Sequence, residues 1–354
     1  MRNLAHTYRV LSHIFSREAS DSLLTTTLSP ETELWDDLVT LASSHLTLPA
    51  LYASLHSKNL QHLMPNDLNN YLAEISLMNR ERNQALLSQI NVLSDLFKQH
   101  HITHVFLKGS ALLVSGIFND TAERMLGDID ILIAPKQLTE AYALLLDNGY
   151  QKPPMTFGVD YFEHKHLPRL LPNELTGIGA VELHSKLFEH HSYTPLIADN
   201  ILHHKQQIQG FSLPCWEHLL WHNILNWQYN DFGGLTNTLS FRSAYDTVII
   251  LNKHPYLLET PWPQNKSIER YFKIMRGYFS DVNAFQPNVN NWHARFYQFK
   301  LNYPKLLEHY NRTLKFCNRF PTLWDRFNMF VSNHTYRKLI WQDRKRILRL
   351  LFKY

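Results

Sequence analysis

Cysteine is scarce in this chain. The two cysteines, Cys215 and Cys317, lie too far apart in the sequence to form a CxxC zinc or redox motif. Two are also too few for the disulfide framework of a small secreted domain. We therefore expect a protein of a reducing compartment.

Long apolar runs are missing as well. No window reaches the roughly 18–20 uncharged apolar residues that a membrane-spanning helix needs. The N-terminal stretch MRNLAHTYRVLSHIFSREAS has its apolar residues interrupted by polar ones, so it lacks the apolar centre of a signal peptide. These absences predict a cytoplasmic protein without a membrane span.

The excess of one charge over the other is small. The chain has 35 Lys and Arg against 31 Asp and Glu, which leaves a net charge of +4. This mild basicity suits a polyanionic ligand such as a nucleotide, but it is no strong nucleic-acid signature. A hydrophobic content of 44% excludes a disordered chain, and 354 residues predict two or three subdomains.

Helical spacing of apolar residues is present at both ends of the chain. Residues 1–98 predict an N-terminal helical region, in which SPETELWDDLVTLASSHL predicts a helix with Ser29 as N-cap and Pro30 in its first turn. After Pro214 the helical period returns in CWEHLLWHNILNWQY and LSFRSAYDTVIILNK. Residues 213–354 therefore predict a C-terminal helical region, and the role of residues 255–354 stays open.

The pattern changes between these regions, in residues 99–212. The segments ITHVFL, DIDILIA and GAVELHSKLF are short and apolar, and helical stretches alternate with them. A further extended candidate is YFEHKHLPRLL. The order predicts an α+β unit with a small mixed sheet and flanking helices.

Two aspartates open the second of these predicted strands. Alternate side chains of a strand point to the same side, so Asp128 and Asp130 share one face and Ile129 and Ile131 the other. Two neighbouring carboxylates raise each other's pKa unless a cation offsets their repulsion. A hard divalent cation such as Mg²⁺, bound to nucleotide phosphates, is the natural partner.

A third carboxylate follows in the segment VELH. Glu182 shares a strand face with His184, and Val181 and Leu183 face the other way. If this strand lies beside the DIDILI strand, Glu182 completes a cluster of three carboxylates with Asp128 and Asp130. Such a cluster can hold two metal ions that activate a hydroxyl group and stabilise a leaving pyrophosphate.

The segment LKGS supplies groups suited to phosphate. A glycine at a strand-to-helix turn, here Gly109, lets the backbone approach a phosphate, and a helix that begins near Ser110 presents free N–H groups. Lys108 and Arg124 are nearby cations that can neutralise charge developing on phosphate oxygens.

Each of these residues also has an ordinary explanation. The aspartates can be solvated side chains at a strand entry, and Lys108 can extend from the strand end into solvent. Arg124 can pair with Glu123 or Asp120 on the surface, and His184 can be a half-buried histidine. The order and spacing of the whole set favour the metal site.

Histidine pairs offer a different kind of chemistry. His164 and His166 share a predicted strand face, and His218 and His222 lie one helical turn apart, which is suitable spacing for transition-metal ligands. The first pair has no evident third ligand, so the prediction is ordinary polar side chains. Trp216 and Trp221 surround the second pair, so the prediction there is packing.

The segments LKGSALL, ERMLGDIDILI and VELH together resemble the polymerase-β-type nucleotidyltransferase superfamily, whose pattern is a Gly-Ser turn, a D-x-D pair and a later carboxylate. With the helical N-terminal region and a later P…LL…H helix, residues 30–250 are similar to a bacterial group of uncharacterised nucleotidyltransferases. The resemblance implies an α+β fold in which a polymerase-β-like nucleotidyltransferase core is embedded between the two helical regions.

The resemblance also implies roles for individual residues. It implies that Asp128, Asp130 and Glu182 are the catalytic carboxylates and metal ligands. The residues implied to bind nucleotide phosphates are Lys108, Gly109, Ser110 and Arg124. Supporting positions near the site are implied for His184 and, in the segment FRSAYD, for Arg242 and Asp246.

The implied activity is transfer of a nucleoside monophosphate from a nucleoside triphosphate such as ATP to an acceptor, with release of pyrophosphate. The expected cofactor is a pair of Mg²⁺ ions, with Mn²⁺ as the substitute. The acceptor stays open among a small molecule, an RNA 3′ end and a protein hydroxyl. Two alternatives are a catalytically silent relative that binds nucleotide or a partner protein, and a transition-metal hydrolase built on the histidines.

Overall fold

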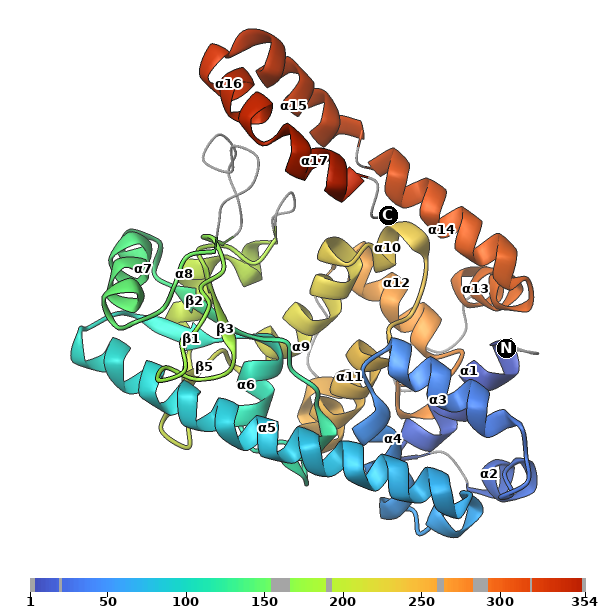
Figure 1. Ribbon diagram of the computed structural model, residues 1–354. Coiled ribbons are helices and arrows are strands. Elements are labelled where there is room, and N and C mark those ends of the chain that lie inside the picture. Colours follow the sequence, from blue (N-terminus) through green and yellow to red (C-terminus); the bar gives the residue numbers. More distant parts are fainter. Residues whose placement is uncertain are drawn as a thin grey trace.

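Helices make up most of the molecule, and a small sheet lies at one end (Figure 1). The computed structural model describes residues 4–18, 21–153, 166–188, 193–259, 264–282, 292–318 and 320–351. No described helix is both long and apolar enough to cross a membrane. The division of the chain at 98/99 and 212/213 stays a prediction.

The first hundred residues are mainly helical, as their apolar spacing predicts. Their helices are α1 (Leu4–Phe15), α2 (Ser22–Thr27), α3 (Leu34–Ser44), α4 (Leu48–Ser57) and α5 (Asn66–Gln99). The helix α5 is uninterrupted and runs along one side of the molecule, from the bundle of α1 to α4 to the sheet (Figure 1).

The expected N-cap at Ser29 is wrong. α3 begins at Leu34, and residue Glu33 precedes it. The carbonyl oxygen of Ser29 instead accepts hydrogen bonds from the indole Nε1 of Trp35, at 3.0 Å, and from the backbone N–H of Thr32, at 3.1 Å. Trp35 is 3% exposed, so packing of this indole keeps the preceding residues in a turn.

The middle of the chain contains the sheet and its connecting helices. The elements are β1 (His104–Phe106), α6 (Lys108–Val114), the 3₁₀ turn η2 (Thr121–Glu123), β2 (Asp128–Ile133), α7 (Leu138–Asp147), β3 (Ala180–His184), α8 (Ala198–His203), β4 (Gln206–Ile208) and β5 (Phe211–Leu213). The strand order is β1-β2-β3, with β1 antiparallel and β3 parallel to β2. The predicted small mixed sheet is thus confirmed.

Two other extended segments lie outside this sheet order. The first five residues of YFEHKHLPRLL, including His164, lie outside the described residues, and its remainder forms isolated bridges from His166 and Leu170 to β3. The hairpin of β4 and β5 was not predicted.

The second half of α5 covers one face of the sheet. A single apolar cluster contains Leu86, Ile90, Leu93 and Phe97 of α5 together with Ile129, Ile131 and Ile133 of β2 and Val181 and Leu183 of β3. Burial of these side chains supplies the main driving force for docking the sheet on the helix. The opposite strand faces are left to carry Asp130 and Glu182.

Gln89 of α5 ties down the chain just before β3. Its side-chain carbonyl accepts hydrogen bonds from the backbone N–H groups of Ile178 and Gly179, and its amide donates to the carbonyl of Gly179 and to the hydroxyl of Tyr150. The bonds span 2.8 to 3.0 Å and satisfy backbone groups that burial would otherwise leave unpaired. They fix the starting point of the strand that carries Glu182.

The C-terminal helices return to pack on the N-terminal ones. They are α9 (Trp216–Leu225), the π-helical turn η6 (Asn226–Asn230), α10 (Gly233–Thr236), α11 (Phe241–Lys253), α12 (Lys266–Met275), α13 (Trp292–Asn302), α14 (Pro304–Asn318), α15 (Phe320–Ser332), α16 (His334–Gln342) and α17 (Arg344–Leu351). One apolar cluster joins Leu11 and Leu51 to Tyr245 and Tyr271. The two helical regions therefore share a core.

Candidate active site

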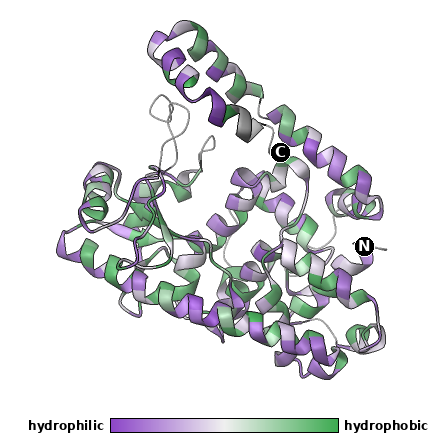
Figure 2. Ribbon diagram, viewed as in Figure 1, coloured by the Kyte–Doolittle hydropathy of each residue, from purple (hydrophilic) through white to green (hydrophobic). Residues whose placement is uncertain are grey.

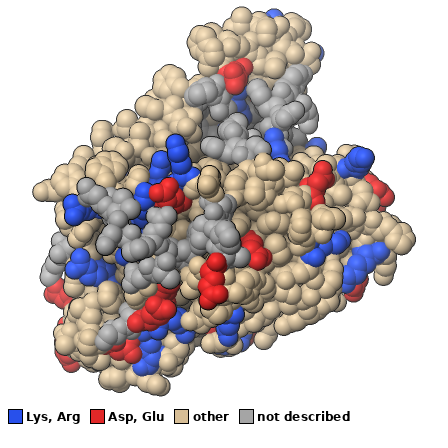
Figure 3. All heavy atoms as spheres, turned by 180° about the vertical axis from the view of Figure 1, so that it is seen from behind, with Lys and Arg blue, Asp and Glu red and all other residues tan. Residues whose placement is uncertain are grey.

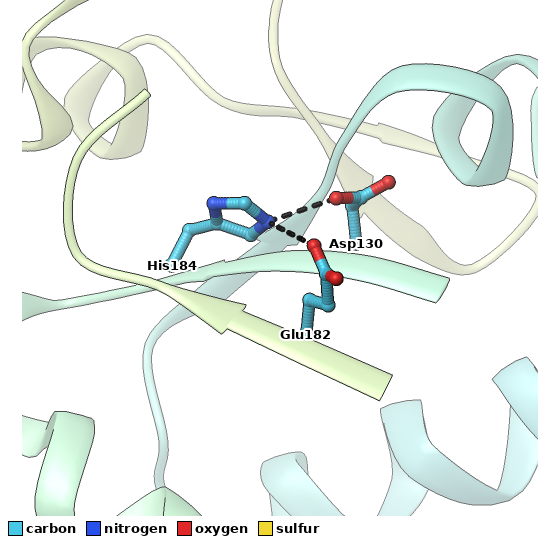
Figure 4. Close-up of side chains that lie close together, drawn as sticks. All are labelled: Asp130, Glu182 and His184. Carbon is cyan, nitrogen blue, oxygen red and sulfur yellow. Dashed lines mark hydrogen bonds and ion pairs between the residues drawn. The ribbon is translucent and has the colours of Figure 1, made fainter. Parts of the chain in front are cut away.

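The register of β2 and β3 brings two predicted carboxylates together. Asp130 lies directly opposite Glu182, and His184 lies on the same face of β3 (Figure 4). The Nε2 atom of His184 is 2.8 Å from Oδ1 of Asp130 and 3.7 Å from Oε2 of Glu182. The prediction that the VELH strand neighbours the DIDILI strand is confirmed.

Asp130, Glu182 and His184 form a candidate metal-binding group. One ligand atom from each lies within 4.8 Å of the others, and within the described part of the chain this is the only such group of three. Carboxylate oxygens are the ligands that Mg²⁺ prefers, whereas imidazole is more typical of transition metals. The donor set therefore accommodates a divalent cation without defining which one.

Asp128 lies two residues before Asp130, at the start of β2. Its register partner on β3 is Ala180, and its carboxylate is 3.6 Å from Nη2 of Arg169. Burial raises the pKa of Asp128, and the negative charges of Asp130 and Glu182 raise it further. A cation near this carboxylate would favour its charged form.

Lys108 occupies the junction between β1 and α6. Its backbone has φ +51°, the left-handed region, so the sharp turn falls on Lys108 and Gly109 lies inside the first turn of α6. The Nζ atom donates to Oδ1 of Asp130 at 2.5 Å. Burial lowers the pKa of Lys108, but the charges of Asp130, Glu182 and Asp128 outweigh it and the pKa is raised.

The charges on Asp130 and His184 are set by opposing effects. Burial disfavours the charged carboxylate of Asp130, yet Lys108 and His184 outweigh it and hold the pKa of Asp130 well below its ordinary value. Burial lowers the pKa of His184 to about 4, although Asp130 acts in the opposite direction. At neutral pH the pair is therefore a carboxylate beside a neutral imidazole.

Ser110 of α6 contacts the backbone of β2 through its hydroxyl group. Its hydroxyl oxygen accepts a hydrogen bond from the backbone N–H of Asp130 at 3.3 Å and lies 3.4 Å from the carbonyl oxygen of Asp128, to which it can donate. Ser110 is 1% exposed, so its side chain braces the strand. The first backbone N–H groups of α6, at Lys108 to Ser110, precede the intrahelical hydrogen-bond ladder.

Arg124 connects the sheet region to the C-terminal helices. Its Nε donates to both carboxylate oxygens of Asp246 on α11, at 2.9 and 3.0 Å, and its Nη1 donates to the carbonyl of Met125 at 2.6 Å. The suggested surface pairing with Asp120 or Glu123 is not formed: Asp120 pairs with Arg80, and Glu123 accepts from the hydroxyl of Tyr245. Arg124 therefore packs inside the molecule.

A cavity of about 390 Å³ lies beside these groups. The predicted residues Lys108, Gly109, Arg124, Asp128, Asp130, Arg242 and Asp246 all line it. The opposite wall comes from α9 and η6 through Asn223, Asn226 and Trp227. A π-helical turn is rare in proteins and frequent at functional sites, and here it forms part of the cavity wall.

Arg242 is a half-buried cation in this cavity. Burial lowers its pKa, Arg124 adds to this effect, and the carboxylates of Asp246, Asp231 and Asp128 oppose it. No described residue lies within ion-pair or hydrogen-bond distance of its guanidinium. Its N–H donors are therefore available to a bound anion.

Some residues in or near the site had not been assigned to it from the sequence. Arg169 stands in the segment after His166, and its guanidinium is 3.6 Å from Asp128. His166 was considered only as a partner of His164, yet its Nε2 is 3.9 Å from Glu182. For Asn223 and Asn226 no sequence signal existed, because their importance depends on where α9 docks.

Asp130 and Glu182 lie opposite each other on neighbouring strands and form, with His184, a group that could hold a metal ion. Lys108 contacts Asp130, and Arg124 and Arg242 line the same cavity as Asp130. Residues 31–263, more than half of the chain, match the family described as "Uncharacterised nucleotidyltransferase", and the chain belongs to this family. The resemblance drawn from the sequence motifs is thus confirmed. Among curated proteins, none matches the chain.

Proposed function

We propose that this protein transfers a nucleoside monophosphate from a nucleoside triphosphate to an acceptor hydroxyl or phosphate and releases pyrophosphate. The observation that carries the proposal is the opposition of Asp130 and Glu182 across β2 and β3, with the ammonium of Lys108 on Asp130. The family match supports the same reaction class. We infer that the sheet with α6 is a polymerase-β-like core.

The three carboxylates fit the cofactor that this reaction needs. Asp128, Asp130 and Glu182 are proposed to hold two Mg²⁺ ions, for which Mn²⁺ can substitute. When bound, such ions neutralise phosphate charge and make the acceptor hydroxyl a better nucleophile. His184 donates to Asp130 and so orients the carboxylate toward Glu182.

The cations and N–H groups of the cavity are proposed to bind the triphosphate. The first turn of α6, with Gly109 and Ser110, offers backbone N–H groups, and Lys108 lies at its start. The Nη2 atom of Arg124 is not used by Asp246 or Met125 and lies near Gly109, which lines the same cavity. These groups stabilise the negative charge that accumulates on the departing pyrophosphate.

The reaction then needs few further groups from the protein. The acceptor oxygen forms a bond to the α-phosphorus while the bond between that phosphorus and the pyrophosphate oxygen breaks, and a hydroxyl acceptor releases its proton to solvent. Holding both reactants in the cavity converts this into an intramolecular step. The acceptor class stays open among a small molecule, an RNA 3′ end and a protein hydroxyl.

Incubation of the protein with each α-labelled nucleoside triphosphate, Mg²⁺ and a cell extract tests the proposal. We expect label to appear in one of three fractions, protein, RNA or small molecules, and to disappear when a chelator removes the metal. The labelled fraction identifies the acceptor class. Label that persists undiminished with the chelator present would contradict the metal-dependent mechanism.

The alternative is a catalytically silent member of the family that binds nucleotide or a partner. It predicts calorimetric binding of a nucleoside triphosphate with Mg²⁺, but no pyrophosphate release with any extract. A transition-metal hydrolase would instead be purified with stoichiometric zinc, iron or manganese, which elemental analysis detects. This test is motivated by His184 in the candidate metal-binding group, because imidazole is a common ligand of transition metals.

Arg242 should contribute to binding of the triphosphate. We expect Arg242→Ala to raise the KM for the nucleoside triphosphate about 10-fold to 100-fold, because a charge-assisted hydrogen bond to phosphate is lost. Steady-state kinetics measure this change. Arg270→Ala is the matched control, since that arginine donates to the carbonyl of Gly234 and does not line the cavity. An unchanged KM in Arg242→Ala contradicts the assignment.

A further inference from the structure

The last four helices differ in charge from the rest of the protein. We call residues 304–351, which contain α14 to α17, the basic arm. From residue 304 to the end the chain has 12 Lys and Arg against 3 Asp and Glu, a net charge of +9. Residues 1–303 have 23 Lys and Arg against 28 Asp and Glu, a net charge of −5. The small overall charge therefore hides a strongly basic segment.

The basic arm also exposes a continuous apolar stripe. On α15 the exposed large apolar residues are Phe320, Leu323, Trp324, Phe327, Phe330 and Val331. They follow the i, i+3, i+4, i+7 spacing, so they share one face of the helix. Trp324 is 63% exposed, and Trp341 of the neighbouring α16 is 67% exposed. Figure 2 shows the alternation of apolar and polar residues along these helices.

The apolar stripe is not covered by the described part of the molecule. Figure 1 shows α15 to α17 standing away from the body, and none of the side chains of α15 that the structure describes is buried. Among the described side chains of α14 to α17, Tyr336 is the buried one. In Figure 3 the surface of this part is largely uncharged on the side seen there. An exposed apolar surface of this kind marks an interaction site.

The residue types of the basic arm favour one kind of binding partner over the others. The charged residues of α15 are Asp325 and Arg326, and most of the excess of Lys and Arg lies on α16 and α17, which follow it in the arm. An apolar helix face in a segment rich in Lys and Arg is the pattern of segments that lie in the plane of a membrane surface. RNA would use the cations and aromatic rings, but it leaves Leu323 and Val331 uncovered because bases stack on rings. Contact between the arms of two copies brings two net charges of +8 together, which is repulsive.

We propose that the basic arm binds the surface of an anionic phospholipid membrane. The apolar stripe of α15 enters the boundary between headgroups and acyl chains, and the Lys and Arg side chains contact the phosphate headgroups. Lys338 and Lys345 are exposed and suited to this contact. The nucleotidyltransferase site is then held beside the membrane.

Co-sedimentation of the full chain with vesicles tests the proposal. We expect binding to vesicles that contain phosphatidylglycerol, little binding to pure phosphatidylcholine, and weaker binding as salt rises. Lys338→Ala with Lys345→Ala should weaken binding about 25-fold, about five-fold for each charge. When Trp324→Ser and Phe327→Ser are added to these two changes, they should remove most of the affinity for vesicles that is left, because they interrupt the apolar stripe.

The matched control replaces exposed apolar residues of the body. Leu77 and Met78 on α5 are 50% and 59% exposed, and Leu77→Ser with Met78→Ser should bind vesicles as the parent does. Thermal unfolding of every variant verifies the fold. Absence of vesicle binding by the parent overturns the proposal, as does equal loss in the control. Binding to RNA or self-association through the arm, with no vesicle binding, also overturns it.

Discussion

Replacing Asp130 by asparagine should lower the rate of nucleotidyl transfer by about 10³-fold or more. Asp130 is the central carboxylate of the site: Lys108 and His184 both contact its Oδ1, and Glu182 lies opposite. The amide keeps the size of the side chain but loses the negative charge that a divalent cation needs. Label transfer from an α-labelled nucleoside triphosphate measures the loss.

A matched control separates the site from a general effect of charge removal. Asp95 lies on the surface of α5 and pairs with Lys98 at 3.6 Å, so Asp95→Asn should leave transfer unchanged. Asp128→Asn should cause a loss similar to that of Asp130→Asn if Asp128 is a metal ligand, as proposed. If the folded Asp130→Asn variant transfers the nucleotide at the rate of the parent protein, the proposed mechanism is wrong.

Arg124→Ala should destabilise the protein by about 3–5 kcal/mol. The change leaves the carboxylate of Asp246 buried, with side-chain exposure of 2%, and without the arginine whose Nε contacts both its oxygens. Burial already raises the pKa of Asp246, and Arg124 opposes that effect. Chemical denaturation with an extrapolated free energy of unfolding measures the change.

Arg80→Ala is the control for this prediction. Arg80 pairs with Asp120 through two bonds of 3.0 and 2.6 Å, but both side chains are more than a third exposed. Its loss should cost at most about 1 kcal/mol.

A double variant separates the structural from the phosphate-binding role of the arginine. Arg124→Met with Asp246→Leu should recover much of the stability, because neither charge is left alone. Its KM for the nucleoside triphosphate should stay raised, since the Nη2 donor is absent. Equal stability of parent and Arg124→Ala contradicts the role of the buried pair.

The elements with strong local patterns were predicted from the sequence. β2 and β3 were found because their apolar residues alternate with the acids, and the N-terminal helices because of their regular spacing. The hairpin of β4 and β5 was missed because its strands, QQI and FSL, are short and contain polar residues, whereas the equally short β1 lies within the apolar segment ITHVFL. The N-cap at Ser29 failed because a tertiary contact, the packing of Trp35, competes with a local capping preference.

The sequence by itself determined the family, the acidic pattern and the face that Asp128, Asp130 and Glu182 occupy, because side-chain alternation along a strand is a local property. Only the tertiary structure decided that Glu182 lies opposite Asp130, that Lys108 carries the left-handed turn, and that Arg124 pairs with Asp246 from α11. These relations depend on strand register and helix docking, which are set by packing between distant segments. The exposure of the apolar stripe on α15 also became evident only from the tertiary structure.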